Sequence, residues 1–146
     1  NVTDRIPGYK FELGKGVTLR EGNDVTIIAV GLMVMEALKA ADMLASEGIH
    51  ARVIDMHTVK PLDTELVKKA AQETGCIVTS EEHSIIGGLG EAVCAYLSEH
   101  CPVPVLRHGV EDTFGRSGKA PLVLEHYGLT AEKLAEKARQ AIKLKK

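Results

Sequence analysis

Apolar and polar positions repeat along the chain, with a short β-rich run ahead of a longer segment of helical spacing. Residues 25–30, VTIIAV, form a continuous apolar run of the kind that is buried on both faces of a parallel sheet. After Gly31, apolar residues recur every three or four positions, which predicts a helix to about Glu47. Gly48 is placed to end this helix as a C-cap glycine. The apolar side of the helix comprises Val34, Leu38, Ala41 and Ala45.

The same unit recurs three more times. A strand at 50–56 precedes a helix that begins at Asp63 and ends at Gly75. Asp63 is a suitable N-cap, and Leu62 and Val67 have the spacing of a hydrophobic staple. The remaining expected elements are a strand at 76–80, a helix after the glycines of 87–90, a strand at 103–107, a loop at 109–121 and a last helix capped by Thr130.

The alternation predicts a three-layer α/β/α fold with a mostly parallel sheet of about five strands. Residues 17–20 and 25–30 flank the turn EGND, which favours a hairpin that adds one antiparallel edge strand. Residues 1–16 are interpreted as a linker and residues 17–146 as one domain. Because the chain starts at Asn1 and not at Met, we expect a piece of a longer polypeptide.

Composition excludes several classes of partner. A net charge of -2 gives no electrostatic attraction to nucleic acid or to an anionic membrane, and an aromatic content of 3% disfavours a base-stacking surface. No segment is apolar and long enough to span a membrane. Cys76, Cys94 and Cys101 form no metal or disulfide motif, so we expect free thiols in the reducing cytoplasm.

Residues 79–97, TSEEHSIIGGLGEAVCAYL, are the most distinctive stretch. Gly87, Gly88 and Gly90 precede a helix, and a helix N-terminus binds anions readily. The stretch has neither the dinucleotide fingerprint nor a Walker lysine. Glycines also permit positive φ and close backbone packing, so a tight turn built for packing is the commoner explanation.

Charged groups near this turn are further candidates. Glu82 and His83, with Glu81, lie at the carboxyl end of a predicted parallel strand, where α/β sheets place their sites. His57 follows the second strand and shares that edge. The alternative is that these groups form hydrogen bonds with the loop or contact another chain. Arg116 and Lys119 in GRSGK could meet a phosphate, although an exposed basic loop is commoner.

Together these motifs resemble the C-terminal domain of transketolase over nearly the whole chain. The likeness is most specific in TSEEHSIIGGLGEAV and in GVEDTFGRSGKAPLVLEHYGLTAEKLAEKA. Residues 8–22, GYKFELGKGVTLREG, resemble the join to the preceding pyrimidine-binding domain. The chain looks closest to the split type, in which the C-terminal half is a separate subunit.

The resemblance implies a thiamine-diphosphate- and Mg-dependent transferase of the pentose phosphate pathway, which moves a two-carbon ketol unit between sugar phosphates. It places both cofactors in the preceding domains or in a separate N-terminal subunit. This domain is then inactive alone, forms a homodimer in the assembly, and has no catalytic, cofactor or metal residues. Its interface or regulatory-ligand candidates are Glu82, His83, Gly87, Gly88, Gly90, Arg116 and Lys119.

Other functions stay open at this stage. Related families with this domain are the beta subunit of 2-oxo-acid dehydrogenases, which would recruit an acyltransferase core, and deoxyxylulose-phosphate synthase. A third possibility is an autonomous small-anion-binding module. We also expect an exposed apolar patch around Ile85, Ile86 and Leu89, with His83 at its rim, through which two copies pair.

Overall fold

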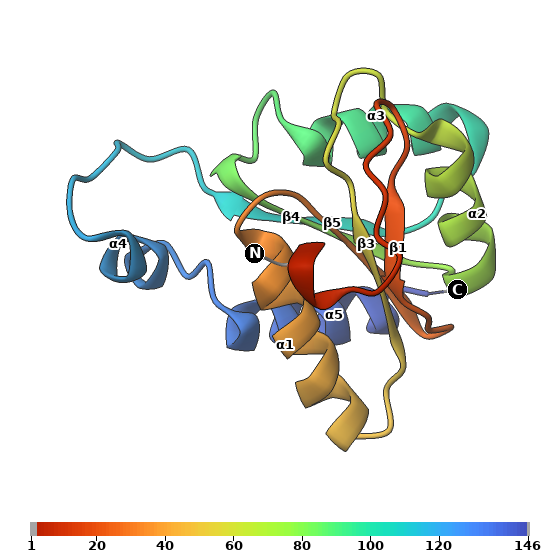
Figure 1. Ribbon diagram of the computed structural model, residues 1–146, viewed down its shortest axis with the longest axis horizontal. Coiled ribbons are helices and arrows are strands. Elements are labelled where there is room, and N and C mark those ends of the chain that lie inside the picture. The colour runs from red at the N-terminus through yellow and green to blue at the C-terminus, as the bar shows by residue number, and fades with distance from the viewer. Residues whose placement is uncertain (1–2, 146) are drawn as a thin grey trace.

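The computed structural model describes residues 3–145 and shows a five-stranded sheet with helices on both faces (Figure 1). The strands are β1 (Val17–Arg20), β2 (Val25–Ala29), β3 (Ala51–Asp55), β4 (Ile77–Ser84) and β5 (Val105–Val110). A 3-10 turn at Thr3–Arg5 precedes them, and the helices are α1 (Met33–Ser46), α2 (Thr64–Thr74), α3 (Leu89–His100), α4 (Ala120–His126) and α5 (Ala131–Lys143). The predicted three-layer α/β/α class is confirmed.

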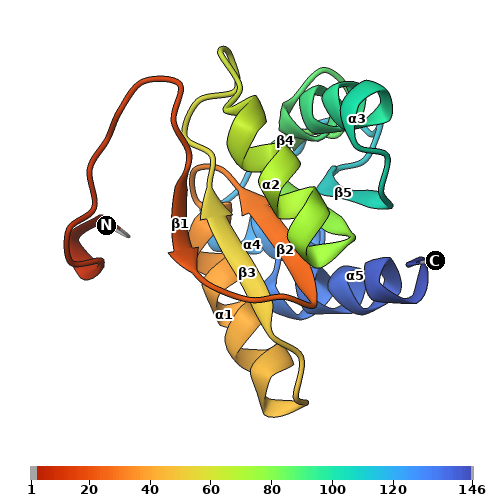
Figure 2. The same ribbon diagram turned by 90° about the vertical axis from the view of Figure 1, so that its right-hand side faces the viewer.

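Two apolar clusters, one on each face of the sheet, form the core. α1 and α5 pack on one face, and α2 and α3 pack on the other (Figures 1 and 2). Neighbouring residues of the central strand point into different clusters, Ile27 toward α1 and α5 and Ile28 toward α2 and α3. Both are fully buried, as expected for a strand covered on both faces.

The strand order β1-β3-β2-β4-β5 creates a topological switch point. Strands β2, β3, β4 and β5 run parallel to one another, and only β1 among the described strands is antiparallel. From β2 the chain first adds β3 on one side and then returns to add β4 on the other side. The connections after β2 and β4 therefore lead to helices on opposite faces, α1 and α3, and doubly wound sheets bind ligands in the crevice at such a point.

The predicted antiparallel edge strand exists, but its predicted partner is wrong. β1 pairs with β3 and not with β2, with Val17 opposite Asp55. Since β3 and β4 occupy both edges of β2, no free edge is left for a hairpin. The turn instead crosses the start of β3, where an added Cβ at Gly22 would lie 2.4 Å from the carbonyl carbon of Ala51.

The segment after β5 also differs from the prediction. The expected loop at 109–121 runs into the short helix α4, which has no buried residue. We call residues 111–126 the α4 arm; it projects away from the body of the domain (Figure 1). A helix of seven residues is too short to give a clear periodic signal, so the sequence pattern did not reveal it.

The predicted helix ends are confirmed. Asp63 Oδ1 accepts a hydrogen bond from the Leu66 amide at 3.2 Å, and Thr130 Oγ1 accepts one from the Lys133 amide at 3.4 Å. Gly75 ends α2 with a φ of 72°. None of the helices within residues 3–145 has the length and apolar character needed to cross a bilayer.

The predicted linker, residues 1–16, is described from residue 3 onward and lies against the carboxyl end of β3. Tyr9 Oη donates to Asp55 Oδ2 at 2.9 Å, and the Gly16 amide donates to Asp63 Oδ2 at 3.0 Å. Burial, followed by the hydrogen bond to Asp55, raises the pKa of Tyr9 to about 12. The phenol therefore remains a proton donor at neutral pH. The assignment of this segment as a linker stays a prediction.

Candidate functional site

A hollow of about 370 Å³ opens at the carboxyl edge of the sheet, beside the ends of β2 and β4. We call it the switch-point hollow. Its lining combines the apolar side chains of Val30, Val59 and Leu89 with Glu81, Glu82, His83 and three glycines, Gly31, Gly87 and Gly88. Four of the seven predicted site candidates, Glu82, His83, Gly87 and Gly88, therefore line one feature of the fold, which is the position where an α/β sheet most often holds a ligand.

Glu81 is the central polar group of this hollow. It is buried, and its two carboxylate oxygens accept hydrogen bonds from the amides of Leu89 at 2.8 Å and Gly90 at 2.9 Å. These amides belong to the first turn of α3, whose N-terminus carries partial positive charge. Glu81 therefore fills, within the chain, the position that a bound anion would take.

At two positions of the turn, neighbouring side chains lie so close to the backbone that a residue larger than glycine would clash with them. An added Cβ at Gly88 would lie 2.0 Å from Glu81 Oε2, so only glycine leaves room for the capping carboxylate. At Gly90 it would lie 2.8 Å from both Thr79 Oγ1 and Arg107 Cγ. The packing interpretation of the glycines accordingly has direct geometric support.

Glycine is favoured at position 87 for a different reason. Its φ is positive, 79°, and there is open space around its α-carbon. The turn it forms is held by Arg107, whose guanidinium donates to the Ile85 carbonyl at 2.9 Å. Ile86 is 52% exposed, as predicted for the surface patch. The prediction for Leu89 is wrong, because it is fully buried against Val93 and the α2 side of the core.

Glu82 and His83 lie beside the hollow and face solvent. His83 Nδ1 is 2.7 Å from the Ser84 carbonyl and 3.9 Å from Glu81 Oε2. Within residues 3–145, no hydrogen bond or ion pair engages the Glu82 side chain. The sequence favoured Glu82 and His83 as anchors, whereas the buried carboxylate that organises the turn is Glu81; the roles of Glu82 and His83 in an interface stay predictions.

Arg116 and Lys119 are not brought to the glycine turn. Both belong to the α4 arm, where the Arg116 guanidinium donates to His126 Nδ1 at 3.3 Å. Lys119 precedes the first residue of α4. The segment that carries them projects away from the body of the domain (Figure 1), and neither residue lines the switch-point hollow.

His57 shares the carboxyl edge, as expected. Its ring stacks on Phe11 of the N-terminal segment with ring centroids 4.5 Å apart. Neither ring nitrogen has a hydrogen-bond partner among the described residues. Since His57 stacks on the linker segment, its imidazole contributes packing between that segment and β3.

Sequence reasoning missed the structural role of His108, which lies on β5. His108 is buried; Nδ1 is 3.0 Å from Ser80 Oγ and Nε2 is 2.9 Å from the Gly128 carbonyl. It thereby connects β4 to the turn before α5. Burial lowers the pKa of His108, partly opposed by the bond to Gly128, and nearby Lys137 lowers the pKa and Glu111 raises it.

Acidification should therefore destabilise the chain through His108. Below the ordinary pKa of 6.5 the unfolded chain gains a proton at this ring while the folded chain does not, so stability falls with falling pH. We expect the free energy of unfolding to drop more between about pH 7.5 and about pH 5.5 in the native chain than in His108→Gln. Urea denaturation at both pH values measures this; an equal drop in both proteins would contradict it.

The cysteines behave as predicted for inert thiols. All three are free; Cys76 is buried, and Cys94 and Cys101 are partly buried. Burial is the main cause of a raised pKa at both Cys76 and Cys94. A raised pKa keeps these sulfurs as thiols and lowers their reactivity.

The glycine turn does not fit the diphosphate group of thiamine diphosphate. A diphosphate at a helix N-terminus needs free amide donors and little negative charge nearby. Here the Leu89 and Gly90 amides are already bonded to the Glu81 carboxylate. The same carboxylate would repel a phosphate.

Comparison with known proteins assigns this chain to a family. Residues 14–134 match the protein family described as "Transketolase, C-terminal domain". A 6-deoxy-6-sulfo-D-fructose transketolase subunit from Clostridium sp. (strain MSTE9) is 50% identical over 136 residues, which cover 93% of this chain and 42% of that protein. A 1-deoxy-D-xylulose-5-phosphate synthase from Heliobacterium modesticaldum is 47% identical over 131 residues, which cover 88% of this chain and 20% of that protein.

A solved structure described as "Split gene transketolase, inactive beta4 tetramer" superposes with a TM-score of 0.91 at 51% identity. The match covers 96% of this chain and 46% of that one, so the chain spans less than half the length of these relatives. The family match, the high identity and the shared sheet topology agree with the resemblance in the glycine turn and the RSGK loop. The chain belongs to the transketolase C-terminal domain family.

Proposed function

We propose that this chain is the C-terminal assembly domain of a transketolase, which transfers a two-carbon ketol unit between sugar phosphates, and that it is not catalytic alone. The observation that carries this proposal is the closure of the α3 N-terminus by Glu81. The most distinctive motif of the sequence thus stabilises a turn. Thiamine diphosphate and Mg are then held by the rest of the assembly.

The partners follow from the relatives. One is described as a transketolase subunit and another as a tetramer of split transketolase chains. We infer that this domain joins preceding transketolase domains or a separate N-terminal subunit, and that it associates with a second copy of itself. Deoxyxylulose-phosphate synthase stays the alternative, since a protein of that name has this domain at 47% identity.

Four exposed apolar residues support an assembly role. Leu32, Val59, Ile86 and Phe114 each follow the carboxyl end of a parallel strand by four residues or fewer, and each is at least 37% exposed. A concentration of large apolar side chains on one edge is typical of a surface that another protein covers. The carboxyl edge of the sheet is therefore the proposed interface.

Calorimetry tests the proposal. Titration of thiamine diphosphate with Mg²⁺ into the 146-residue chain should give no saturable heat. A thermal-unfolding screen with inorganic phosphate and sugar phosphates should likewise show no shift, whereas a ligand at 100 times its Kd would add about 2.7 kcal/mol. Saturable binding of the cofactor would contradict the assembly role, and a shift with phosphate would favour the anion-binding module.

A further inference from the structure

The α4 arm presents one aromatic side chain to solvent. Phe114 is 99% exposed, while its backbone is held because Tyr127 Oη donates to the Phe114 carbonyl at 2.9 Å. Every residue from 111 to 122 is exposed, and Leu122 of α4 is 62% exposed. Since short helices depend on tertiary packing, an arm with this much apolar exposure is suited to contact another surface.

The switch-point hollow has enough volume, and enough apolar lining, to receive an aromatic ring. Its volume is about 370 Å³, and a dry cavity of roughly 150 Å³ is enough to bind benzene. Val30 and Val59 provide accessible apolar walls for a ring, whereas Leu89 borders the hollow but is fully buried. The α3 amides are already bonded to Glu81, so the hollow suits an apolar group better than an anion.

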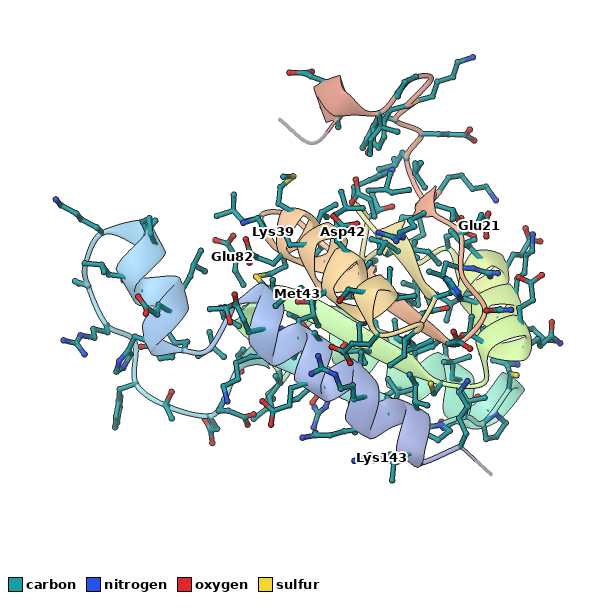
Figure 3. All side chains as sticks on the ribbon, turned by 90° about the horizontal axis from the view of Figure 1, so that it is seen from below. Glu21, Lys39, Asp42, Met43, Glu82 and Lys143 are labelled. Atoms are coloured by element: carbon teal, nitrogen blue, oxygen red, sulfur yellow. The ribbon has the colours of Figure 1, made fainter. Side chains whose placement is uncertain are left out.

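One pair of opposite charges is available to the two surfaces, on an arm that also carries Glu111 and Asp112 before Phe114. Arg116 stands two residues after Phe114, and Lys119 follows on the same arm. Glu82 is exposed at the rim of the hollow and lies on the side of the body that faces the arm (Figure 3). A chain that inserts Phe114 would bring Arg116 toward the rim of the hollow that carries Glu82. Such pairs mainly fix register and partner choice.

We propose that two copies of this chain exchange arms, with Phe114 of each copy in the switch-point hollow of the other and Arg116 beside Glu82. This rests on the self-association in the proposed function and names its contact. The arm does not reach its own hollow, because Phe114 is almost fully exposed and the arm projects from the body (Figure 1). Two-fold symmetry makes the contact twice, which is the commonest closed arrangement.

Sedimentation of single variants is the first test. Phe114→Ser should raise the dimer dissociation constant at least about tenfold, as expected for an aromatic anchor. Met43→Ser is the matched control, because Met43 is an exposed apolar residue of α1 that does not line the switch-point hollow. Its dissociation constant should stay within about twofold. Unchanged circular dichroism would show that both variants fold.

A charge exchange is the second test. Arg116→Glu and Glu82→Arg should each weaken the dimer severalfold, and the double variant should recover most of the loss because it restores an opposite pair. A merely structural role of either residue would not produce this recovery. Mixing Phe114→Ser with Val59→Asp should give a heterodimer that keeps one intact arm contact, while each variant alone is more dissociated.

Three results would overturn the arm exchange. They are a native chain that stays monomeric, a Phe114→Ser dimer of native affinity, and a charge-exchanged pair no tighter than the single variants. Loss of the dimer in Ile86→Asp with no effect of Phe114→Ser would place the contact on the glycine turn alone. None of these results bears on cofactor binding, so the calorimetric test of the proposed function is decided separately.

Discussion

Replacement of Gly88 by alanine is expected to lower the free energy of unfolding by about 2–4 kcal/mol. The added Cβ would lie 2.0 Å from Glu81 Oε2 and 2.8 Å from its Cδ. Because Glu81 is buried, its carboxylate has no open space into which it can rotate cheaply. The carboxylate must leave the α3 amides, or α3 must shift. Urea denaturation followed by circular dichroism gives the change.

A double-mutant cycle shows whether the loss comes from this contact. In a Glu81→Ala background the clash is absent, so adding Gly88→Ala should cost less than about 1 kcal/mol more. The two changes would then be strongly non-additive. Additive losses would mean that Gly88 acts on the fold by a route other than Glu81.

Gly87→Ala is the neighbouring control. Gly87 has open space around its α-carbon, so the only expected penalty is the positive φ, roughly 1–2 kcal/mol. This penalty should be the same with and without Glu81. The comparison separates the cost of a steric clash from the cost of backbone conformation.

The sequence predicted the features that depend on local pattern. The continuous run at 25–30 identified a doubly covered strand, and Asp63, Gly75 and Thr130 marked helix ends because capping is decided within one turn. Gly88 was also singled out. The local pattern did not reveal why this residue must be glycine, because the Glu81 carboxylate that needs the space lies seven residues earlier.

The errors come from tertiary contacts. The turn at 21–24 favours a hairpin in isolation, but the neighbours of β2 are set by residues 51–55 and 77–84, far along the chain. Leu89 was expected at the surface, although its spacing with Val93 and Leu97 is that of a buried helix face. Glu81 and Glu82 are equivalent by composition, and only the path of β4 decides which one reaches α3.

That difference gives the second prediction, in which the two adjacent glutamates respond unequally. Glu81→Ala leaves two buried α3 amides without an acceptor and should lower the free energy of unfolding by about 2–4 kcal/mol. Glu82→Ala removes an exposed carboxylate and should change it by less than about 0.5 kcal/mol. Equal losses would contradict the assignment of Glu81 as the cap.

Removal of the Glu81 carboxylate should also free the anion-binding site that this carboxylate occupies. With the Leu89 and Gly90 amides free at a helix N-terminus, Glu81→Ala should bind inorganic phosphate, and phosphate should restore part of its lost stability. The native chain should show no such effect, and sodium chloride at matched ionic strength controls for screening. Phosphate stabilisation of the variant alone would demonstrate that the glycine turn is an anion site filled by the protein's own side chain; equal stabilisation of both proteins would refute this.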